Sequence, residues 1–197
     1  MPFAGKYQLT PEDAMVAKIP LLTGETDDAT AMAYGYIPGI ARFSPFHGAA
    51  YAVVESLSKL AAVGADPMKS RLTFQEYFER LHDKPERWGK PFSALLGTVD
   101  AQLELGAAAI GGKDSMSGTF LDLDVPPTLI SFAIAPLKTG EVLSPEFKEA
   151  GHPVYLFAGT DAESTKRAWE ELHALALNGR VKAAWAVENG LAEAVMK

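Results

Sequence analysis

Two segments with the apolar spacing of an amphipathic helix set the frame for this chain of 197 residues. Residues 47–63 repeat apolar side chains at i, i+3, i+4 and i+7, and residues 91–105 do the same. The stripe of the second segment consists of Phe92, Leu95, Leu96, Val99 and Leu103. A further helical pattern is predicted at 162–177, and a polar-faced segment lies at 74–81. Short apolar stretches typical of strands occur at 29–36, 107–110, 125–135 and 154–158.

The charge balance argues against a nucleic-acid partner. The chain has 18 basic and 25 acidic residues, a net charge of −7, and no run of lysine or arginine that can follow a phosphate backbone. Hydrophobic residues make up 48 % of the chain and charged residues 22 %, as in folded globular domains. Disordered and coiled-coil classes are therefore excluded.

The lack of cysteine and the length of the apolar stretches indicate the cellular compartment. The chain has no cysteine, so it has no disulfide framework, thiolate nucleophile or cysteine-based zinc site. The longest near-apolar stretch, 125–137, holds three prolines and is shorter than the roughly 20 residues of a membrane helix. The N-terminus lacks the basic start and apolar core of a signal peptide. We expect a cytoplasmic protein with no membrane contact.

The glycine-bracketed segment 111–118 offers the clearest chemistry. It combines flexible backbone with one cation, one carboxylate and two hydroxyls, from Gly112, Lys113, Asp114, Ser115 and Ser117. Backbone N–H groups in such loops can cradle phosphate oxygens, while lysine adds charge and serines donate hydrogen bonds. The segment is not a Walker A loop, because alanine stands at the first glycine position and Asp114 follows the lysine. An ordinary solvated turn between strands is the alternative.

Two carboxylates and a histidine are the remaining candidates. Asp13 and Glu55 are candidate Mg²⁺ ligands, because hard cations on nucleotide phosphates are usually held by one or two carboxylates and waters. A surface ion pair is the competing explanation for Glu55, since Lys59 follows it by four residues on an expected helix. His47 can contact substrate, or it can act as a cap or packing residue at a helix start.

The sequence Gly-Lys-Asp-Ser-Met-Ser at 112–117 closely resembles the signature of large phosphoribosylformylglycinamidine synthases. Further stretches in the same order resemble one bacterial branch of that family: SPFHGA at 44–49, AVGAD at 62–66, LTFQEYFER at 72–80 and DVPPTL at 124–129. Several long matches in order are more specific than one glycine loop.

This resemblance implies the fold and the domain organisation. It implies the nucleotide-binding α/β domain shared with aminoimidazole ribonucleotide synthetase, with a mixed sheet backed by the helices at 47–63 and 91–105. Residues 1–150 are expected to form this domain, which belongs to the second of two related synthetase halves. Residues 151–197 are expected to be the beginning of a truncated companion α/β domain. We expect the exposed sheet to pair with a similar domain, either in the first synthetase half or in a homodimer.

The resemblance also implies a reaction. The family uses ATP and Mg²⁺ to activate the formyl amide oxygen of formylglycinamide ribonucleotide, and ammonia from glutamine then displaces the phosphate. A separate glutaminase domain with a catalytic cysteine supplies the ammonia, so this chain alone is expected to be inactive. Asp13 and Glu55 match family Mg²⁺ ligands, and Gly112, Lys113, Asp114, Ser115 and Ser117 match the phosphate-contacting signature.

Two departures from the family pattern give a second hypothesis. Lys59 stands where the family pattern has an asparagine ligand, and protonated lysine cannot ligate Mg²⁺. The stretch 185–190 replaces the acidic His-Asp-x-Ser-Asp-Gly-Gly motif of the companion domain. The alternative is therefore a non-catalytic scaffold or dimerisation domain with a degenerate nucleotide site. A stand-alone phosphate-transferring kinase of the same superfamily is a third possibility.

Overall fold

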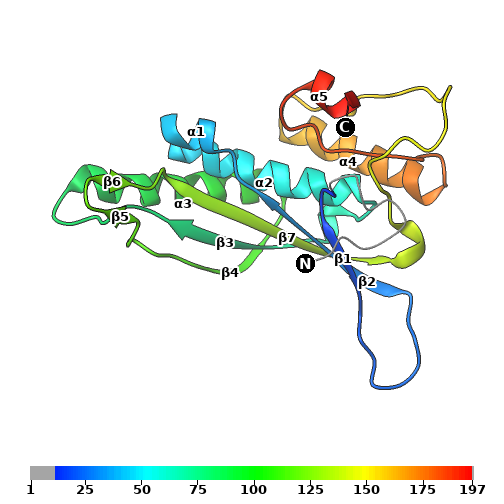
Figure 1. The fold of residues 1–197 in the computed structure, drawn as a ribbon, viewed down its shortest axis with the longest axis horizontal. Coiled ribbons are helices and arrows are strands. Elements are labelled where there is room, and N and C mark those ends of the chain that lie inside the picture. The colour runs from blue at the N-terminus through cyan, green and yellow to red at the C-terminus, as the bar shows by residue number, and fades with distance from the viewer. Residues whose placement is uncertain (1–11, 197) are drawn as a thin grey trace. The chain divides into compact units, whose positions relative to one another are not determined.

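The computed structural model describes residues 12–196 (Figure 1). Its strands are β1 (Met15–Lys18), β2 (Asp28–Gly35), β3 (Arg71–Tyr77), β4 (Ala109–Lys113), β5 (Thr119–Phe120), β6 (Leu123–Asp124) and β7 (Thr128–Lys138). Its helices are α1 (Pro38–Phe43), α2 (Pro45–Ala62), α3 (Pro85–Leu105), α4 (Ala162–Leu177) and α5 (Leu191–Met196), with short 3-10 turns at Pro67–Lys69 and Thr139–Glu141.

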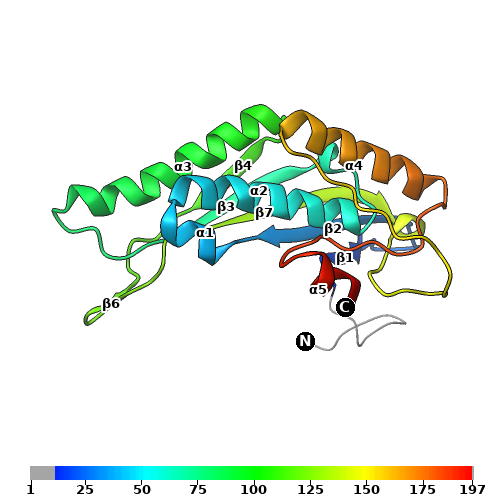
Figure 2. The ribbon, with the colours of Figure 1, turned by 90° about the horizontal axis from the view of Figure 1, so that it is seen from above.

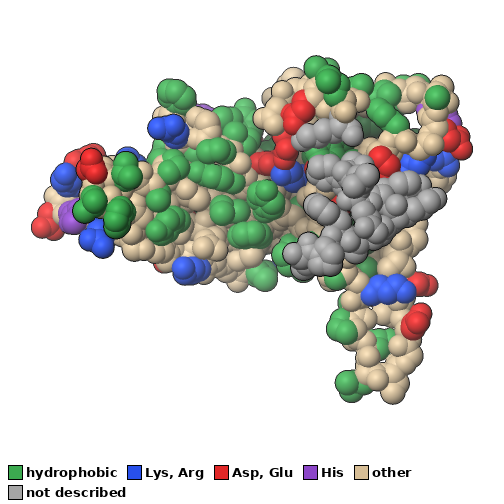
Figure 3. All heavy atoms as spheres, in the orientation of Figure 1, with side chains coloured by type: hydrophobic (Ala, Val, Ile, Leu, Met, Phe, Trp, Pro, Cys, Tyr) green, Lys and Arg blue, Asp and Glu red, His purple; other side chains and the backbone are tan. Residues whose placement is uncertain are grey.

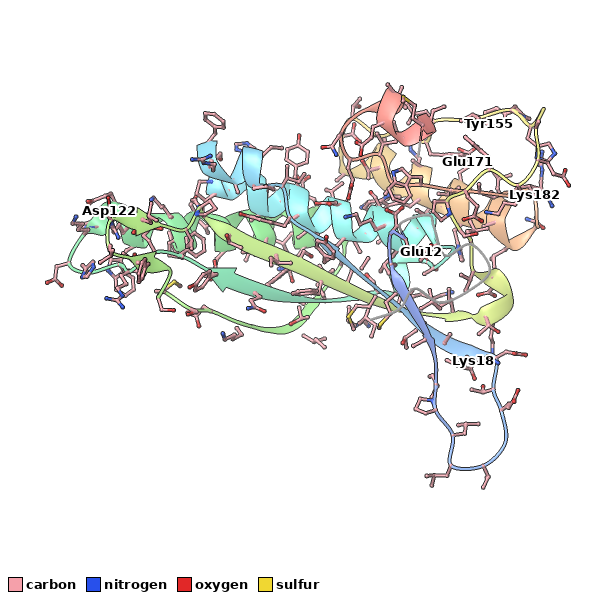
Figure 4. All side chains as sticks on the ribbon, viewed as in Figure 1. Glu12, Lys18, Asp122, Tyr155, Glu171 and Lys182 are labelled. Carbon is pink, nitrogen blue, oxygen red and sulfur yellow. The ribbon has the colours of Figure 1, made fainter. Side chains whose placement is uncertain are left out.

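The main sheet is mixed, as predicted. Its strand order is β1-β2-β7-β3-β4, with β1 and β2 antiparallel and β3 and β4 parallel. Strands β5 and β6 form a separate hairpin, and Asp122 lies at its turn (Figure 4). The expected α/β class with a helix-backed mixed sheet is therefore confirmed.

The chain divides into two compact units that share β2, α2 and β7. Unit 1 combines the N-terminal residues up to Ala33 with 58–69 and 134–197, and unit 2 combines 34–57 with 70–133. The predicted division into residues 1–150 and 151–197 stays a prediction. Each unit is described separately below.

Helix α2 follows its sequence pattern. The predicted stripe packs inward through Val53, Leu57, Leu60 and Ala61, which are all buried. The helix begins at Pro45, two residues before the predicted start, and ends before Gly64. In unit 2, its first part and α3 lie on the same side of β3 (Figure 2). The predicted helical backing of the sheet is thus present.

The large apolar stripe of α3 predicts which face of the helix is buried, but in the structure the opposite face is buried. The members of that stripe are all exposed: Phe92, Leu95, Leu96, Val99 and Leu103. Small residues form the inner face instead, and a Cβ at Gly97 would stand 2.1 Å from the carbonyl oxygen of Phe46. Helix α3 therefore approaches the start of α2 too closely for a larger side chain, which leaves its bulky face outside.

Of the other predicted elements, one helix is confirmed and one strand is wrong. Helix α4 has the predicted bounds, and the Asp161 carboxylate caps its first turn by accepting the Ser164 N–H at 2.7 Å. The strand predicted at 154–158 is wrong, because this exposed segment pairs with no strand among the residues described. Segment 74–81 becomes the end of β3 and the loop after it.

The surface of unit 2 carries many apolar side chains. Figure 3 shows them gathered over its strands, and the exposed residues there include Tyr34, Tyr77 and Ile110. Across residues 12–196, none of the helices is both long and apolar enough to cross a membrane.

Candidate phosphate-binding site

The candidate loop begins at the end of a parallel strand. Gly111, Gly112 and Lys113 belong to β4 and pair with Thr73, Phe74 and Gln75 of β3, so the predicted loop is shorter than expected. A Cβ at Gly112 would lie 2.7 Å from the Phe74 carbonyl oxygen. Glycine is therefore required here, because the two strands approach each other closely. The sequence does not predict this requirement, because it does not show the register of the strands.

The backbone of β3 and its extension fixes the rest of the loop. The Ser115 N–H donates to the Glu76 carbonyl at 3.1 Å, and the Phe78 N–H donates to the Ser115 carbonyl at 3.0 Å. The Gly118 N–H then donates to the Phe78 carbonyl at 2.9 Å. These bonds hold both ends of 115–118 against one strand. An ordered loop of this kind can present side chains with little entropy cost on binding.

The side chains of this loop leave a cation available. The Lys113 side chain is exposed and makes no hydrogen bond or ion pair with any residue in the described part of the chain. The hydroxyl oxygens of Ser115 and Ser117 lie 2.9 Å apart and share one hydrogen bond. Because only one of the two donates in that bond, the other hydroxyl hydrogen can point toward a ligand. An ammonium and a hydroxyl pair suit an anionic oxygen ligand.

A buried carboxylate lies beside this loop. Glu76 is 4 % exposed, and its Oε1 atom has no hydrogen-bond partner. Burial, and to a smaller extent the nearby Asp114 charge, raise the pKa of Glu76 to about 7. Near neutral pH the carboxyl is therefore partly protonated, which reduces its repulsion of an anion at the loop. The alternation of Leu72, Phe74 and Glu76 on the inner face of β3 is the sequence signal that could have found it.

Two hollows in unit 2 adjoin the loop and the hairpin. One of about 400 Å³ is lined by Tyr77, Ser117, Gly118, Thr119, Phe120, Leu123, Asp124 and Val125. A second of about 540 Å³ is lined by Arg42, Phe43, Pro45, Lys90 and residues 124–127. Lys90 pairs with Glu79 at 2.5 Å, and Arg87 pairs with Asp124 at 2.6 Å. The first hollow reaches the loop at Ser117 and Gly118.

His47 lies in the first turn of α2. Its Nδ1 atom is 2.7 Å from the Ser44 hydroxyl, which also accepts the His47 N–H at 3.3 Å. The ring meets Phe46 edge to face at 5.3 Å. These contacts match the predicted cap and packing role, while substrate contact stays a prediction.

The two predicted metal ligands belong to different units. In unit 2, Glu55 Oε2 accepts the Tyr36 N–H at 2.8 Å. In unit 1, Asp13 Oδ2 accepts the Ala186 N–H at 2.8 Å. No group of three or more aspartate, glutamate or histidine residues able to hold a metal occurs within 12–196. Their role as Mg²⁺ ligands therefore stays a prediction.

Lys59 is not on the surface. Its side chain is buried in unit 1, and its Nζ atom lies 2.5 Å from Glu188 Oε1. Because Lys59 is buried, the surface setting expected for its ion pair with Glu55 is wrong. Its partner could not be found from spacing, because Glu188 is distant in sequence.

Taken together, these features define a mixed α/β domain with an anchored loop at the end of a parallel strand. Thermotoga maritima PurL has the same fold: the structure complexed with ATP superposes with a TM-score of 0.64, 18 % identity and coverage of 85 % of this chain and 27 % of that chain. The structure complexed with FGAR has a TM-score of 0.64 and 18 % identity, and the match covers 85 % of this chain and 26 % of that chain. For the structure of PurLQS the TM-score is 0.65 and the identity 19 %, with 84 % of this chain and 26 % of that chain covered.

A curated relative supports the resemblance at the level of sequence. Phosphoribosylformylglycinamidine synthase subunit PurL of Thermococcus sibiricus is 26 % identical over 128 residues. The match covers 64 % of this chain and 17 % of the relative, so the chain spans only a fraction of its relatives' length. A scan against protein-family models finds no match. The resemblance predicted from residues 112–117 is thus confirmed.

Proposed function

We propose that the chain is part of an ATP-dependent carbon–nitrogen ligase of purine biosynthesis. The reaction proposed is that of phosphoribosylformylglycinamidine synthase, in which formylglycinamide ribonucleotide, glutamine and ATP give formylglycinamidine ribonucleotide. Support comes from the PurL relative and from the fold shared with PurL structures complexed with ATP or FGAR. Because the chain spans about a quarter of those chains, it is proposed to be inactive by itself.

The exposed ammonium of Lys113, at the end of β4 where the loop with the Ser115 and Ser117 hydroxyl pair begins, carries this proposal. Lys113 would neutralise a phosphate oxygen, while the serines would donate hydrogen bonds and orient the group. Gly112 allows β4 to approach β3 closely, which sets where Lys113 emerges. Burial, together with the Asp114 charge, raises the pKa of Glu76 and so keeps part of its population neutral beside the loop.

Magnesium is proposed to arrive with the nucleotide phosphates, where it would neutralise their charge. Glu55 of unit 2 fits this purpose as a half-buried carboxylate. In unit 1 the donor set fits less well, because the Lys59 ammonium already lies against Glu188. We therefore assign no step to a metal at Asp13.

The remaining domains of the enzyme are the proposed partners. These are the first synthetase half and a glutaminase domain that supplies ammonia, with a homodimer of this chain as another form of pairing. The exposed apolar stripe of α3 and the apolar strand surface of unit 2 support coverage by further protein. A cytoplasmic location follows from a role in purine biosynthesis.

A non-catalytic scaffold with a degenerate nucleotide site is the second candidate. The buried Lys59–Glu188 pair favours it, because an ammonium occupies unit 1 at the position where the family pattern has a metal-binding asparagine. This candidate requires no ligand at Lys113. The two functions therefore differ in what Lys113 does.

Calorimetric titration with ATP and ADP, with and without Mg²⁺, separates them. We expect binding that Lys113→Ala weakens about tenfold and that Lys84→Ala leaves unchanged, since Lys84 is an exposed lysine of the same unit. Absence of binding at millimolar nucleotide would contradict phosphate binding by this chain and favour the scaffold.

A further inference from the structure

Unit 1 contains a buried cation of its own. Lys59 lies in the last turn of α2 and is only 5 % exposed. A lysine is seldom buried to this extent unless its charge is paired. The pairing comes from Glu188, whose Oε1 lies 2.5 Å from Lys59 Nζ and whose side chain is 28 % exposed.

The segment that carries Glu188 is held at a second point by another carboxylate. Asp13 is buried, and its Oδ2 accepts the N–H of Ala186, two residues before Glu188. One short segment therefore joins a carboxylate near β1 to an ammonium on α2. The Asp13–Ala186 attachment is buried, and Lys59 is the buried end of the other attachment, which strengthens both relative to fully exposed contacts.

Helix α4 of unit 1 contacts residues close to Lys59. The Trp169 indole N–H of α4 donates to the hydroxyl of Ser58, the neighbour of Lys59, at 3.2 Å. His173 Nδ1, also on α4, lies 3.1 Å from the Gly64 carbonyl oxygen. Helix α4 thus packs on the end of α2 that bears Lys59.

The chemistry of this donor set disagrees with a magnesium site. Mg²⁺ requires oxygen ligands in an octahedral arrangement, whereas an ammonium has three donors and no acceptor. A second cation beside Lys59 would be repelled in a poorly hydrated environment, and it would compete for the oxygens of Glu188. An ammonium also cannot leave the site as a metal ion can.

We propose that Lys59 takes the place of a divalent cation in unit 1, so that its ammonium permanently holds segment 185–188 and makes this unit independent of magnesium. The claim concerns unit 1 alone and does not require nucleotide binding at Lys113. Asp13 then serves as a structural acceptor.

Thermal unfolding of the whole chain without nucleotide tests this directly. The protein, Lys59→Asn and the control Lys69→Asn are compared with 10 mM MgCl₂ or with NaCl of equal ionic strength. Lys69 is a suitable control, because its side chain is 68 % exposed and pairs only loosely with Asp66 at 3.4 Å. We expect unchanged Tm in Mg²⁺ for the unmodified chain and for Lys69→Asn.

Lys59→Asn is expected to lower Tm by about 6–10 °C in NaCl and to recover several degrees in Mg²⁺, since asparagine offers an oxygen ligand. Equal Tm for Lys59→Asn and the unmodified chain, or no recovery in Mg²⁺, would overturn the proposal.

A calorimetric Mg²⁺ titration of the unmodified chain keeps the proposal testable even if Lys59→Asn does not fold. We expect no saturable binding that depends on Asp13. Submillimolar Mg²⁺ binding that Asp13→Asn abolishes would overturn the proposal. Because neither experiment contains nucleotide, failure here is distinguishable from failure of phosphate binding at Lys113.

Discussion

Lys59 of unit 1 and Lys113 of unit 2 show how the environment decides what a lysine does. Lys59 is buried and paired with Glu188, whereas the Lys113 side chain is exposed and makes no hydrogen bond or ion pair within the described chain. A paired, buried ammonium stabilises the fold, while an unpaired, exposed one is available to a ligand. Stability should therefore depend on the first lysine and ligand affinity on the second.

The largest expected effect is the loss of the buried charge. Lys59→Met should lower the free energy of unfolding by about 2–3 kcal/mol, because it removes the charge-assisted hydrogen bond between the buried Lys59 ammonium and Glu188. Lys113→Met should change it by less than about 0.5 kcal/mol, as expected at an exposed position. Urea unfolding of both variants measures the difference. Equal losses would break the comparison between the two lysines.

Glu76 should make unit 2 sensitive to pH. The pKa of Glu76 is about 7 in the folded chain, against an ordinary value of 4.5. At pH values between 4.5 and 7, folding is therefore accompanied by uptake of a proton at Glu76. This contribution to stability is greatest at low pH, falls as pH rises through the window from 4.5 to 7, and is absent above it. Glu76→Gln should therefore be more stable than the unmodified chain by about 2–3 kcal/mol at pH 8.

Unfolding experiments at pH 5 and pH 8 measure this effect. The gain from Glu76→Gln should shrink toward pH 5. Asp122→Asn, at the exposed hairpin turn, is the control and should show no such trend. A gain that is independent of pH would show that burial of the charge is not its cause.

Gly112→Ala tests whether this glycine serves the sheet. The added Cβ would meet the Phe74 carbonyl oxygen at 2.7 Å, so we expect a loss of about 2 kcal/mol without any ligand. Gly111→Ala is the matched control, because a Cβ there has no atom within 4 Å. Chemical denaturation compares them, and equal stability of the two variants would contradict the close strand approach.

The smallest expected effect concerns the ligand. Lys113→Met should weaken ATP binding about tenfold, or about 1.4 kcal/mol, while Lys59→Met should leave the affinity of the folded fraction unchanged. Titration calorimetry at a temperature where both variants are folded measures this. A larger loss of affinity in Lys59→Met would reverse the assignment of the two lysines.

The sequence predicted the elements better than it predicted their environments. Helices α2 and α4 follow from clear apolar spacing, and the mixed sheet follows from the family resemblance. The inward face of α3 could not be predicted, because the large apolar side chains lie outside and the small Gly97 face packs against α2. Residues 154–158 have strand composition, but a strand also requires a partner.

For the candidate site too, the sequence predicted the loop but not the surroundings of the side chains. Lys113 does end β4, and the hydroxyls of Ser115 and Ser117 do meet in the loop that follows. Neither the burial of Glu76 nor the pairing of Lys59 with Glu188 follows from local spacing, because both depend on tertiary contacts. Motif matching therefore located the loop, and only the structure distinguished the two lysines.

Hydrogen exchange of the whole chain with and without ATP and Mg²⁺ tests this distinction most directly. We predict slower exchange of the backbone amides at 113–118 when ATP is present, and no change at 185–190 with either ATP or Mg²⁺. Protection confined to 185–190, with 113–118 unchanged, would contradict the account.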